Sequence, residues 1–306
     1  MLPSRPFFWG TPDGAEVLRL HQRVLERTFP EGWFSAKPRL NHPAYERWKL
    51  CEDLLTSGGS IKYPSQEPLL PQLGRIILDS SVFVMLTEGD LAKAETGLLS
   101  SYGDLSVQSF MRSRLPDRRL FEDVMVELAF GAWHKSRGHR VTPLEVEGYP
   151  DLEIRLPGIA LPVLAECKRL STESENRIRN VLTKANSQIR TRGGECYGVA
   201  VLDVSNVVNA GRVNDDRLPL ALQAVVGTVN SALQRQNRAV AAALLLWDDY
   251  MMVGTPPEPT LVVFRRRYVT VRHGAPEREI PEGASLFEGF STGYWLLWET
   301  RVAADV

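Results

Sequence analysis

The sequence predicts an α/β protein in which a mixed central sheet is flanked by helices and preceded by an α-helical region. Residues 1–112 show apolar side chains at helical spacing and no convincing strand pattern. Residues 113–306 instead alternate between amphipathic helices and β-type runs, which is typical of a sheet covered by helices. The 306 residues are 43% hydrophobic and 24% charged, so the chain can bury one large core or two modest ones.

Three helices are expected in the N-terminal region. Apolar residues recur at helical spacing over 16–27 and 45–55, and residues 69–86 are strongly apolar. Stretches rich in Ser, Thr and Gly separate these segments, as is typical of loops. We expect residues 1–112 to form a region that recognises the substrate or a protein partner.

The second region, residues 113–306, is expected to form the α/β domain. Its amphipathic segments predict helices over 120–135, 175–189 and 218–236, and its β-type runs predict strands over 141–146, 151–156, 162–168, 198–203, 240–247 and 260–271. Residues 294–298 are expected to dock as a strand or helix. Because the helices are interleaved with the strands, the predicted sheet is mixed and has helices on its faces.

The overall charge excludes a protein that coats nucleic acid through general basicity. The chain has 36 basic and 37 acidic side chains, which remains compatible with a local basic groove. Its three cysteines form no CxxC pair, so neither a disulfide framework nor a zinc ribbon is expected. We recognise no signal peptide, and the longest apolar run, residues 239–247, is shorter than the roughly 20 residues of a membrane span. We expect a soluble, cytoplasmic protein without membrane contact.

Two carboxylates and a lysine are predicted to share one face of a β-hairpin. Glu166 and Lys168 lie two residues apart in an expected strand, so they point to the same side, and Asp151 begins the preceding strand. A hairpin with a symmetric loop would place Asp151 opposite Leu164 or Lys168. In either register Asp151 lies on the face of Glu166 and Lys168, where directly opposed Cβ atoms are about 5 Å apart and diagonal ones about 7–8 Å. A slip of one residue would separate the two carboxylates.

This arrangement suits hydrolysis of a phosphodiester. Carboxylate oxygens are ligands that Mg²⁺ prefers, and the carbonyl of Cys167 is a further candidate ligand. Lys168 would orient or deprotonate the attacking water, or stabilise the charged transition state. The alternative is a solvated strand face, because one acid-x-Lys pattern is expected in this chain by chance. The order of the motifs between two helices favours chemistry.

Residues 117–205 resemble the PD-(D/E)XK, or restriction-endonuclease-like, nuclease superfamily. The resemblance consists of Pro150-Asp151, Glu166-Cys167-Lys168, a Glu-bearing helix before them and an Ala-x-x-Gln helix after them. It implies an endonuclease in which Asp151 and Glu166 bind Mg²⁺, for which Mn²⁺ can substitute, while Lys168 serves the water. DNA is the implied substrate rather than RNA, in restriction, phage defence or repair, and a homodimer is plausible because many such enzymes cut both strands.

The resemblance also implies further site residues on the two flanking helices. A Glu of the first helix often joins such a site, and we prefer Glu127 to Glu122 because of its distance to the following strand. Gln188 and Lys184 lie one turn apart on the second helix, where related nucleases place Lys or Gln. Each of these helix positions is otherwise simply a solvated surface residue.

Basic residues gather next to the proposed site. Residues 166–192 contain seven basic and three acidic side chains, and Arg169 and Lys184 are the candidates for nucleic-acid contact. Two further basic groups are weaker candidates. Arg265, Arg266 and Arg267 are typical of a charged edge strand, and His134 and His139 are typical of a helix end that is capped or exposed.

Other functions are less favoured by the sequence. Asp203, Asp248 and Asp249 follow expected strands, where carboxylates bind Mg²⁺ in other α/β enzymes, although such residues more often start turns. The sequence contains no Walker loop, GxGxxG, HExxH or GxSxG motif, which disfavours ATPases, zinc proteases and serine hydrolases. Two alternatives remain. One is a catalytically inactive member that binds nucleic acid or a protein partner, and the other is an adaptor or sensor formed by residues 1–112 with the nuclease as its effector.

Overall fold

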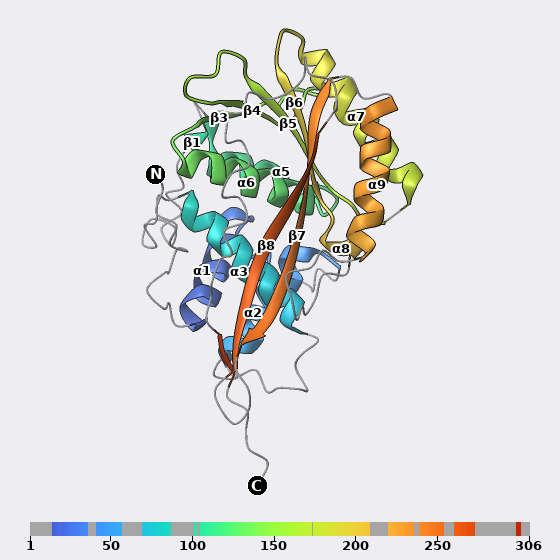
Figure 1. Cartoon of the computed structure of the whole chain (residues 1–306). Coiled ribbons are helices and arrows are strands. Elements are labelled where there is room, and N and C mark those ends of the chain that lie inside the picture. The colour runs from blue at the N-terminus through green and yellow to red at the C-terminus, as the bar shows by residue number, and fades with distance from the viewer. Residues whose placement is uncertain are drawn as a thin grey trace.

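A mixed sheet forms the centre of the molecule, as the sequence predicts (Figure 1). The structure is a computed structural model that describes residues 14–35, 41–56, 69–86, 101–102, 105–172, 174–208, 220–235, 239–253, 260–272 and 298–300. Among these residues, no helix is long and apolar enough to cross a membrane.

Seven described strands follow one another across the sheet in chain order. They are β3 (Arg140–Pro143), β4 (Leu152–Arg155), β5 (Val163–Arg169), β6 (Tyr197–Asp203), β7 (Val240–Val253), β8 (Thr260–Arg272) and β9 (Trp298–Thr300). The pairs β5–β6 and β6–β7 are parallel, whereas β3–β4, β4–β5, β7–β8 and β8–β9 are antiparallel. The parallel pairs require crossovers, and helices supply them.

Helices cover both faces of the sheet (Figure 1). They are α1 (Gly14–Thr28), α2 (Pro43–Thr56), α3 (Leu70–Met85), α5 (Val107–Arg114), α6 (Phe121–Ser136), α7 (Glu175–Arg192), α8 (Ser205–Val208) and α9 (Leu220–Arg235). The alternation of β5 separates the two layers: Ala165 and Cys167 pack with α6 and the N-terminal helices, whereas Leu164 packs with α7 and α9. Because both faces are buried, the central strands are apolar on both sides.

The N-terminal helices belong to the same core as the sheet. Val24 of α1 and Phe83 of α3 lie in one hydrophobic cluster with α6 and the inner strands, and α3 also packs against Tyr250 and Phe264 of β7 and β8. The predicted α-helical region is therefore present as a layer on the sheet. The boundary predicted at residue 112 falls inside α5.

Several elements differ from the prediction, among them the short helix α8 after β6, which was not expected. The N-terminal region contains a short hairpin, β1 (Ser101–Tyr102) and β2 (Leu105–Ser106), and the helix α5, none of which was predicted. Strand β7 continues to Val253 because β8 pairs with it along its whole length. Of the predicted docking segment, only Trp298 lies within the described residues, at the start of β9.

A close approach in β6 explains why position 198 holds glycine. A Cβ atom on Gly198 would lie 2.1 Å from the carbonyl oxygen of Ala239 and 2.9 Å from Ile189 Cδ1. We expect Gly198→Ala to lower the free energy of unfolding by about 1–3 kcal/mol or more, because the backbone of Ala239 has to move. Gly227→Ala is the control, since nothing lies within 4 Å of its Cβ position and removing a helical glycine stabilises by about 0.5–1 kcal/mol. Urea unfolding measures both, and equal destabilisation of the two variants would contradict the prediction.

Burial of His21 makes stability depend on pH. Its side chain is 1% exposed and its Nδ1 lies 3.2 Å from Ser80 Oγ, and burial, together with the charge of Arg47, lowers its pKa to about 3. The unfolded chain therefore binds the extra proton between about pH 6.5 and pH 3, so this contribution to stability falls by about 1.4 kcal/mol per pH unit as the pH decreases. Unfolding free energies of wild type and His21→Leu, measured from pH 5 to 8.5, should differ in slope below pH 6.5 and run parallel above it. Parallel curves throughout would contradict a neutral buried imidazole.

Candidate active site

The residues predicted to carry chemistry meet at the carboxyl end of β5. Lys168 Nζ lies 3.0 Å from Glu166 Oε1 and 3.4 Å from Asp151 Oδ2. The same ammonium donates a hydrogen bond to the carbonyl of Cys167 at 2.9 Å. The three oxygen atoms that the sequence predicts as cation ligands therefore surround a single point, and in this structure the lysine ammonium lies there.

The register of the β4–β5 hairpin differs from both predicted registers. Leu152 pairs with Ala165. If this pairing is continued by one residue, Asp151 lies opposite Glu166 rather than opposite Leu164 or Lys168. The reason is that the connection between β4 and β5 is asymmetric. More residues separate the tight turn at Gly158, whose φ is 76°, from β5 than from β4. Because the shift equals two residues, Asp151 stays on the face of Glu166 and Lys168, as predicted.

Two hydrogen bonds hold Asp151 in place. Its Oδ2 accepts the backbone N–H of Cys167 at 2.8 Å, which ties the start of β4 to β5. Gln188 Nε2 donates to the carbonyl of Tyr149 at 2.8 Å, two residues before Asp151. The predicted residue Gln188 thus lies next to the site and anchors the turn that carries Asp151, while its buried Oε1 accepts no hydrogen bond from the described residues.

Glu166 is a buried carboxylate with little solvation. It is 1% exposed, and its Oε1 pairs with the Lys168 ammonium at 3.0 Å. Burial raises the pKa of Glu166 to about 7, the charge of Asp151 adds to this effect, and Lys168 opposes it. Burial also lowers the pKa of the Lys168 ammonium, but the charges of Asp151 and Glu166 outweigh burial and raise it. Such a cluster attracts cations.

Glu127, rather than Glu122, lies on the side of Asp151. It is 1% exposed, and its Oε2 accepts a hydrogen bond from Arg114 at 2.7 Å. Burial raises the pKa of Glu127 well above its ordinary value, the charge of Asp151 adds to this, and Arg114 opposes it. Glu127 is linked to Asp151 through Arg114 and makes no direct contact with it among the described interactions.

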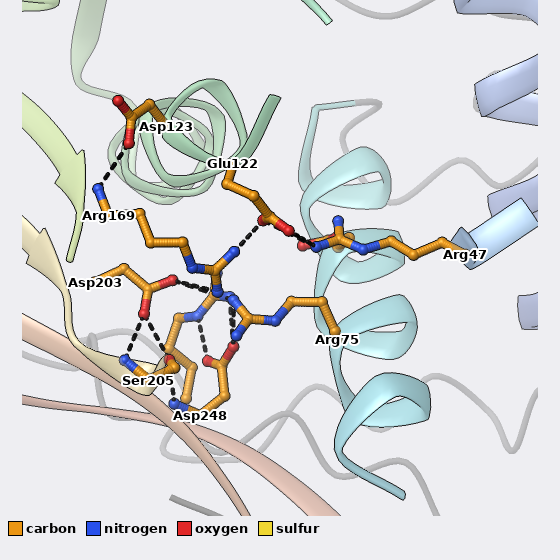
Figure 2. A network of polar contacts seen from close by, with 10 residues as sticks. Arg47, Arg75, Glu122, Asp123, Arg169, Asp203, Ser205 and Asp248 are labelled. Atoms are coloured by element: carbon orange, nitrogen blue, oxygen red, sulfur yellow. Dashed lines mark hydrogen bonds and ion pairs between the residues drawn. The ribbon is translucent and has the colours of Figure 1, made fainter. Parts of the chain in front are cut away.

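Arg169, predicted to contact nucleic acid, lies instead in a buried network of polar contacts (Figure 2). Its guanidinium donates to Glu122 and lies 2.9 Å from Asp203 Oδ2, and its backbone N–H donates to Asp123 Oδ1 at 2.8 Å. The side chain is 7% exposed. This geometry does not favour a contact between Arg169 and a nucleic acid.

The network joins the N-terminal helices to the ends of the strands. Arg47 of α2 forms ion pairs with Asp79 of α3 and with Glu122 of α6. Arg75 of α3 lies 3.1 Å from Asp203 Oδ2, at the end of β6. Figure 2 shows these side chains converging from α2, α3, α6 and the strand ends.

The aspartates of the rival metal site are neutralised by arginines. Arg75 lies between Asp203 and Asp248, at 3.1 and 3.2 Å from their Oδ2 atoms. Asp249 lies 3.3 Å from Arg267. These carboxylates therefore stabilise the strand ends as ion pairs, which does not favour a metal site formed by them.

Three further predicted residues have distinct environments. Lys184 is exposed on α7, and its charge lowers the pKa of Glu166, although burial and Asp151 dominate that shift. His134 is fully buried at the end of α6, and its Nδ1 shares a hydrogen bond of 2.9 Å with His139 Nδ1. Of the two predicted environments, a capping position or an exposed one, exposure is excluded for His134, because the Phe130 and Trp133 rings pack against it.

Sequence reasoning missed two residues next to the site. Asp123 lies four residues before Glu127, so both residues lie on the same side of α6. The helical spacing in the sequence could therefore have identified Asp123. Burial raises the pKa of Asp123 to about 6, with Lys168 opposing. Arg114 belongs to α5, a helix that the sequence did not predict, so no signal pointed to it.

The donor set fits a divalent cation with a preference for oxygen. Across the part of the chain that the structure describes, no three or more His, Cys, Asp or Glu side chains form a group that could hold a metal ion. The predicted set consists of two carboxylates and one main-chain carbonyl, all within 3.4 Å of Lys168 Nζ. Hard oxygens of this kind suit Mg²⁺ or Mn²⁺ once the ammonium moves aside.

Comparisons with family models, with curated proteins and with solved structures gave no match. The geometry of the site's own residues therefore carries the functional interpretation.

Proposed function

We propose that this chain is a metal-dependent nuclease that hydrolyses phosphodiester bonds, with DNA as its substrate. One observation carries the proposal: Asp151, Glu166 and the Cys167 carbonyl converge on the Lys168 ammonium at the carboxyl end of β5, an inner strand of the sheet. A cluster of buried like charges is costly for folding alone, which favours a role in chemistry. The resemblance of the sequence to PD-(D/E)XK nucleases supports the same reaction and favours DNA.

Each residue of the cluster has a role in this proposal. Asp151, Glu166 and the Cys167 carbonyl would hold Mg²⁺ or Mn²⁺, which when bound would polarise the phosphate and acidify a water molecule. Lys168 orients the attacking water and stabilises the negative charge that develops on the phosphate. Gln188 keeps Asp151 in position through the carbonyl of Tyr149.

The surface of α7 supports binding of a phosphate backbone. Arg177 and Lys184 lie seven residues apart, therefore on one side of this helix, and both are exposed, and α7 packs against β5 beside the cluster. Positive side chains that follow a helix next to the site position nucleic acid without reading its sequence. A homodimer would bring two such sites to one duplex.

Cleavage of supercoiled plasmid, single-stranded DNA and RNA of matched sequence tests the function. With Mg²⁺ or Mn²⁺ we expect the wild type to cut DNA, and with EDTA we expect no cutting. Asp151→Asn, which removes a predicted ligand while preserving shape, should be inactive with every metal. Cutting that survives in EDTA or in Asp151→Asn would refute this site, preferential cutting of RNA would change the substrate class, and EDTA-resistant binding without cutting would establish the inactive alternative.

A further inference from the structure

Arg114, at the end of α5, lies beside the candidate site and has no role in the mechanism above. Its NH1 donates to Glu127 Oε2 at 2.7 Å, and its NH2 lies 4.0 Å from Asp151 Oδ1. The guanidinium also lies over the ring of Phe110, 4.9 Å from the centroid. Arg114 is therefore held between a buried carboxylate and a carboxylate of the proposed metal site.

The guanidinium keeps unused donors on the side of Asp151. A separation of 4.0 Å is too long for a hydrogen bond, and among the described residues neither NH2 nor Nε of Arg114 donates to any acceptor. The side chain is 25% exposed, so a ligand can reach it. Arginine offers five N–H donors in a planar fork, and only the NH1 edge is committed here.

The local charges indicate which ligand this free edge would take. Asp151, Glu166 and Glu127 bring three carboxylates together, and Lys168 and Arg114 are the cations that contact them. These carboxylates would be partly neutralised by a divalent cation if they held one. The free edge of the guanidinium would then face the place where the substrate's phosphate, an anion, binds. A guanidinium binds phosphate oxygens through short, charge-assisted hydrogen bonds.

We propose that Arg114 is a further catalytic residue, whose NH2 edge binds a non-bridging oxygen of the scissile phosphodiester while NH1 holds Glu127. This inference rests on the proposed nuclease function. It differs from a purely positioning role, in which Arg114 would act only through Glu127.

A double-mutant cycle separates the two roles. Single-turnover cleavage is measured for wild type, Arg114→Ala, Glu127→Gln and the double variant. We expect Arg114→Ala to slow cleavage by about 10²-fold, and still by about tenfold or more in the Glu127→Gln background, where the carboxylate partner is gone. A double variant no slower than Glu127→Gln alone would overturn the contact with phosphate, because the effect would then pass through Glu127.

Two further variants guard against loss of folding. Arg114→Lys keeps the charge without the fork, so we expect it to recover part of the rate lost in Arg114→Ala. Arg112→Ala is the matched control: it lies on the same helix, is exposed and donates to the carbonyl of Arg27, away from the site. Its cleavage rate should equal that of the wild type. Equal losses in Arg112→Ala and Arg114→Ala would overturn the proposal in favour of a general effect of α5.

Binding distinguishes failure of this inference from failure of the nuclease proposal. Fluorescence anisotropy with a labelled duplex oligonucleotide in Ca²⁺ requires no cleavage. If the wild type binds but does not cut, a loss of about tenfold in affinity in Arg114→Ala but not in Arg112→Ala still supports the phosphate contact. Equal affinity of the two variants, or no binding by the wild type, would overturn it.

Discussion

Lys168→Met is expected to slow metal-dependent cleavage by about 10²–10³-fold and at the same time to strengthen the binding of Mg²⁺. The ammonium lies 2.9–3.4 Å from the three oxygens that we propose as metal ligands, so it competes with the cation for them. Methionine preserves the length and apolar character of the stem but removes the charge. Cleavage falls because the water and the developing phosphate charge lose their cation, whereas metal binding gains because the competitor is gone.

Calorimetric titration with Mg²⁺ and single-turnover cleavage measure the two effects separately. A pH of about 9 is suitable, because the pKa of Glu166 is about 7 in the wild type and rises when the charge of Lys168, which lowers it, is removed. Asp151→Asn should lose both Mg²⁺ binding and cleavage. Lys49 is an exposed lysine of α2 that pairs with Glu52, and Lys49→Met should change neither. Weaker Mg²⁺ binding in Lys168→Met would show that the cation does not bind where the ammonium lies, and an undiminished cleavage rate would remove Lys168 from the mechanism.

Arg169→Met is expected to lower the free energy of unfolding by about 3–5 kcal/mol. Arg169 is 7% exposed and forms ion pairs with Glu122 and Asp203. Removing Arg169 takes one cation from the buried carboxylate of Asp203 and from the partly exposed carboxylate of Glu122. A buried charge that loses a partner costs more than the pair contributes. Each carboxylate loses one arginine and keeps another: Glu122 still pairs with Arg47, and Asp203 still pairs with Arg75 (Figure 2).

Chemical unfolding of Arg169→Met and of a matched surface variant tests this expectation. Arg119→Met removes an arginine that pairs with Asp117 but is 87% exposed, so its effect should stay within about 0.5 kcal/mol. Similar unfolding free energies for the two variants would mean that the network contributes no more than a surface ion pair.

The network also bears on the site, because it holds the end of the strand that carries Lys168. Asp123 accepts the backbone N–H of Arg169, the residue after Lys168, while Arg75 and Arg169 both lie within 3.1 Å of Asp203. Helix α3 is thereby tied to the carboxyl ends of β5 and β6. In Arg169→Met we therefore expect cleavage to weaken together with stability.

Several features of the fold and the site followed from the sequence because they depend on local periodicity. Alternation around Glu166 is enough to set Glu166 and Lys168 on one face and Cys167 on the other, whatever the strand pairs with. Asp151 joins them because any even shift of the hairpin preserves the face, so even the incorrect register led to the correct cluster. The helices α6 and α7 were predictable for the same reason, since their apolar stripes repeat within a few residues.

What only the tertiary structure decided concerns charged side chains and their partners. Arg169 has the same local signature as an arginine that contacts DNA, yet it is buried, because Glu122 and Asp203 reach it from two other elements. Arg75 and Asp203 pair across 128 residues of sequence. Periodicity records which face of a segment is apolar, but the partner of a charge depends on how distant segments pack. The assignment of Arg114 to the site and of Arg169 to the interior therefore became visible only in the folded chain.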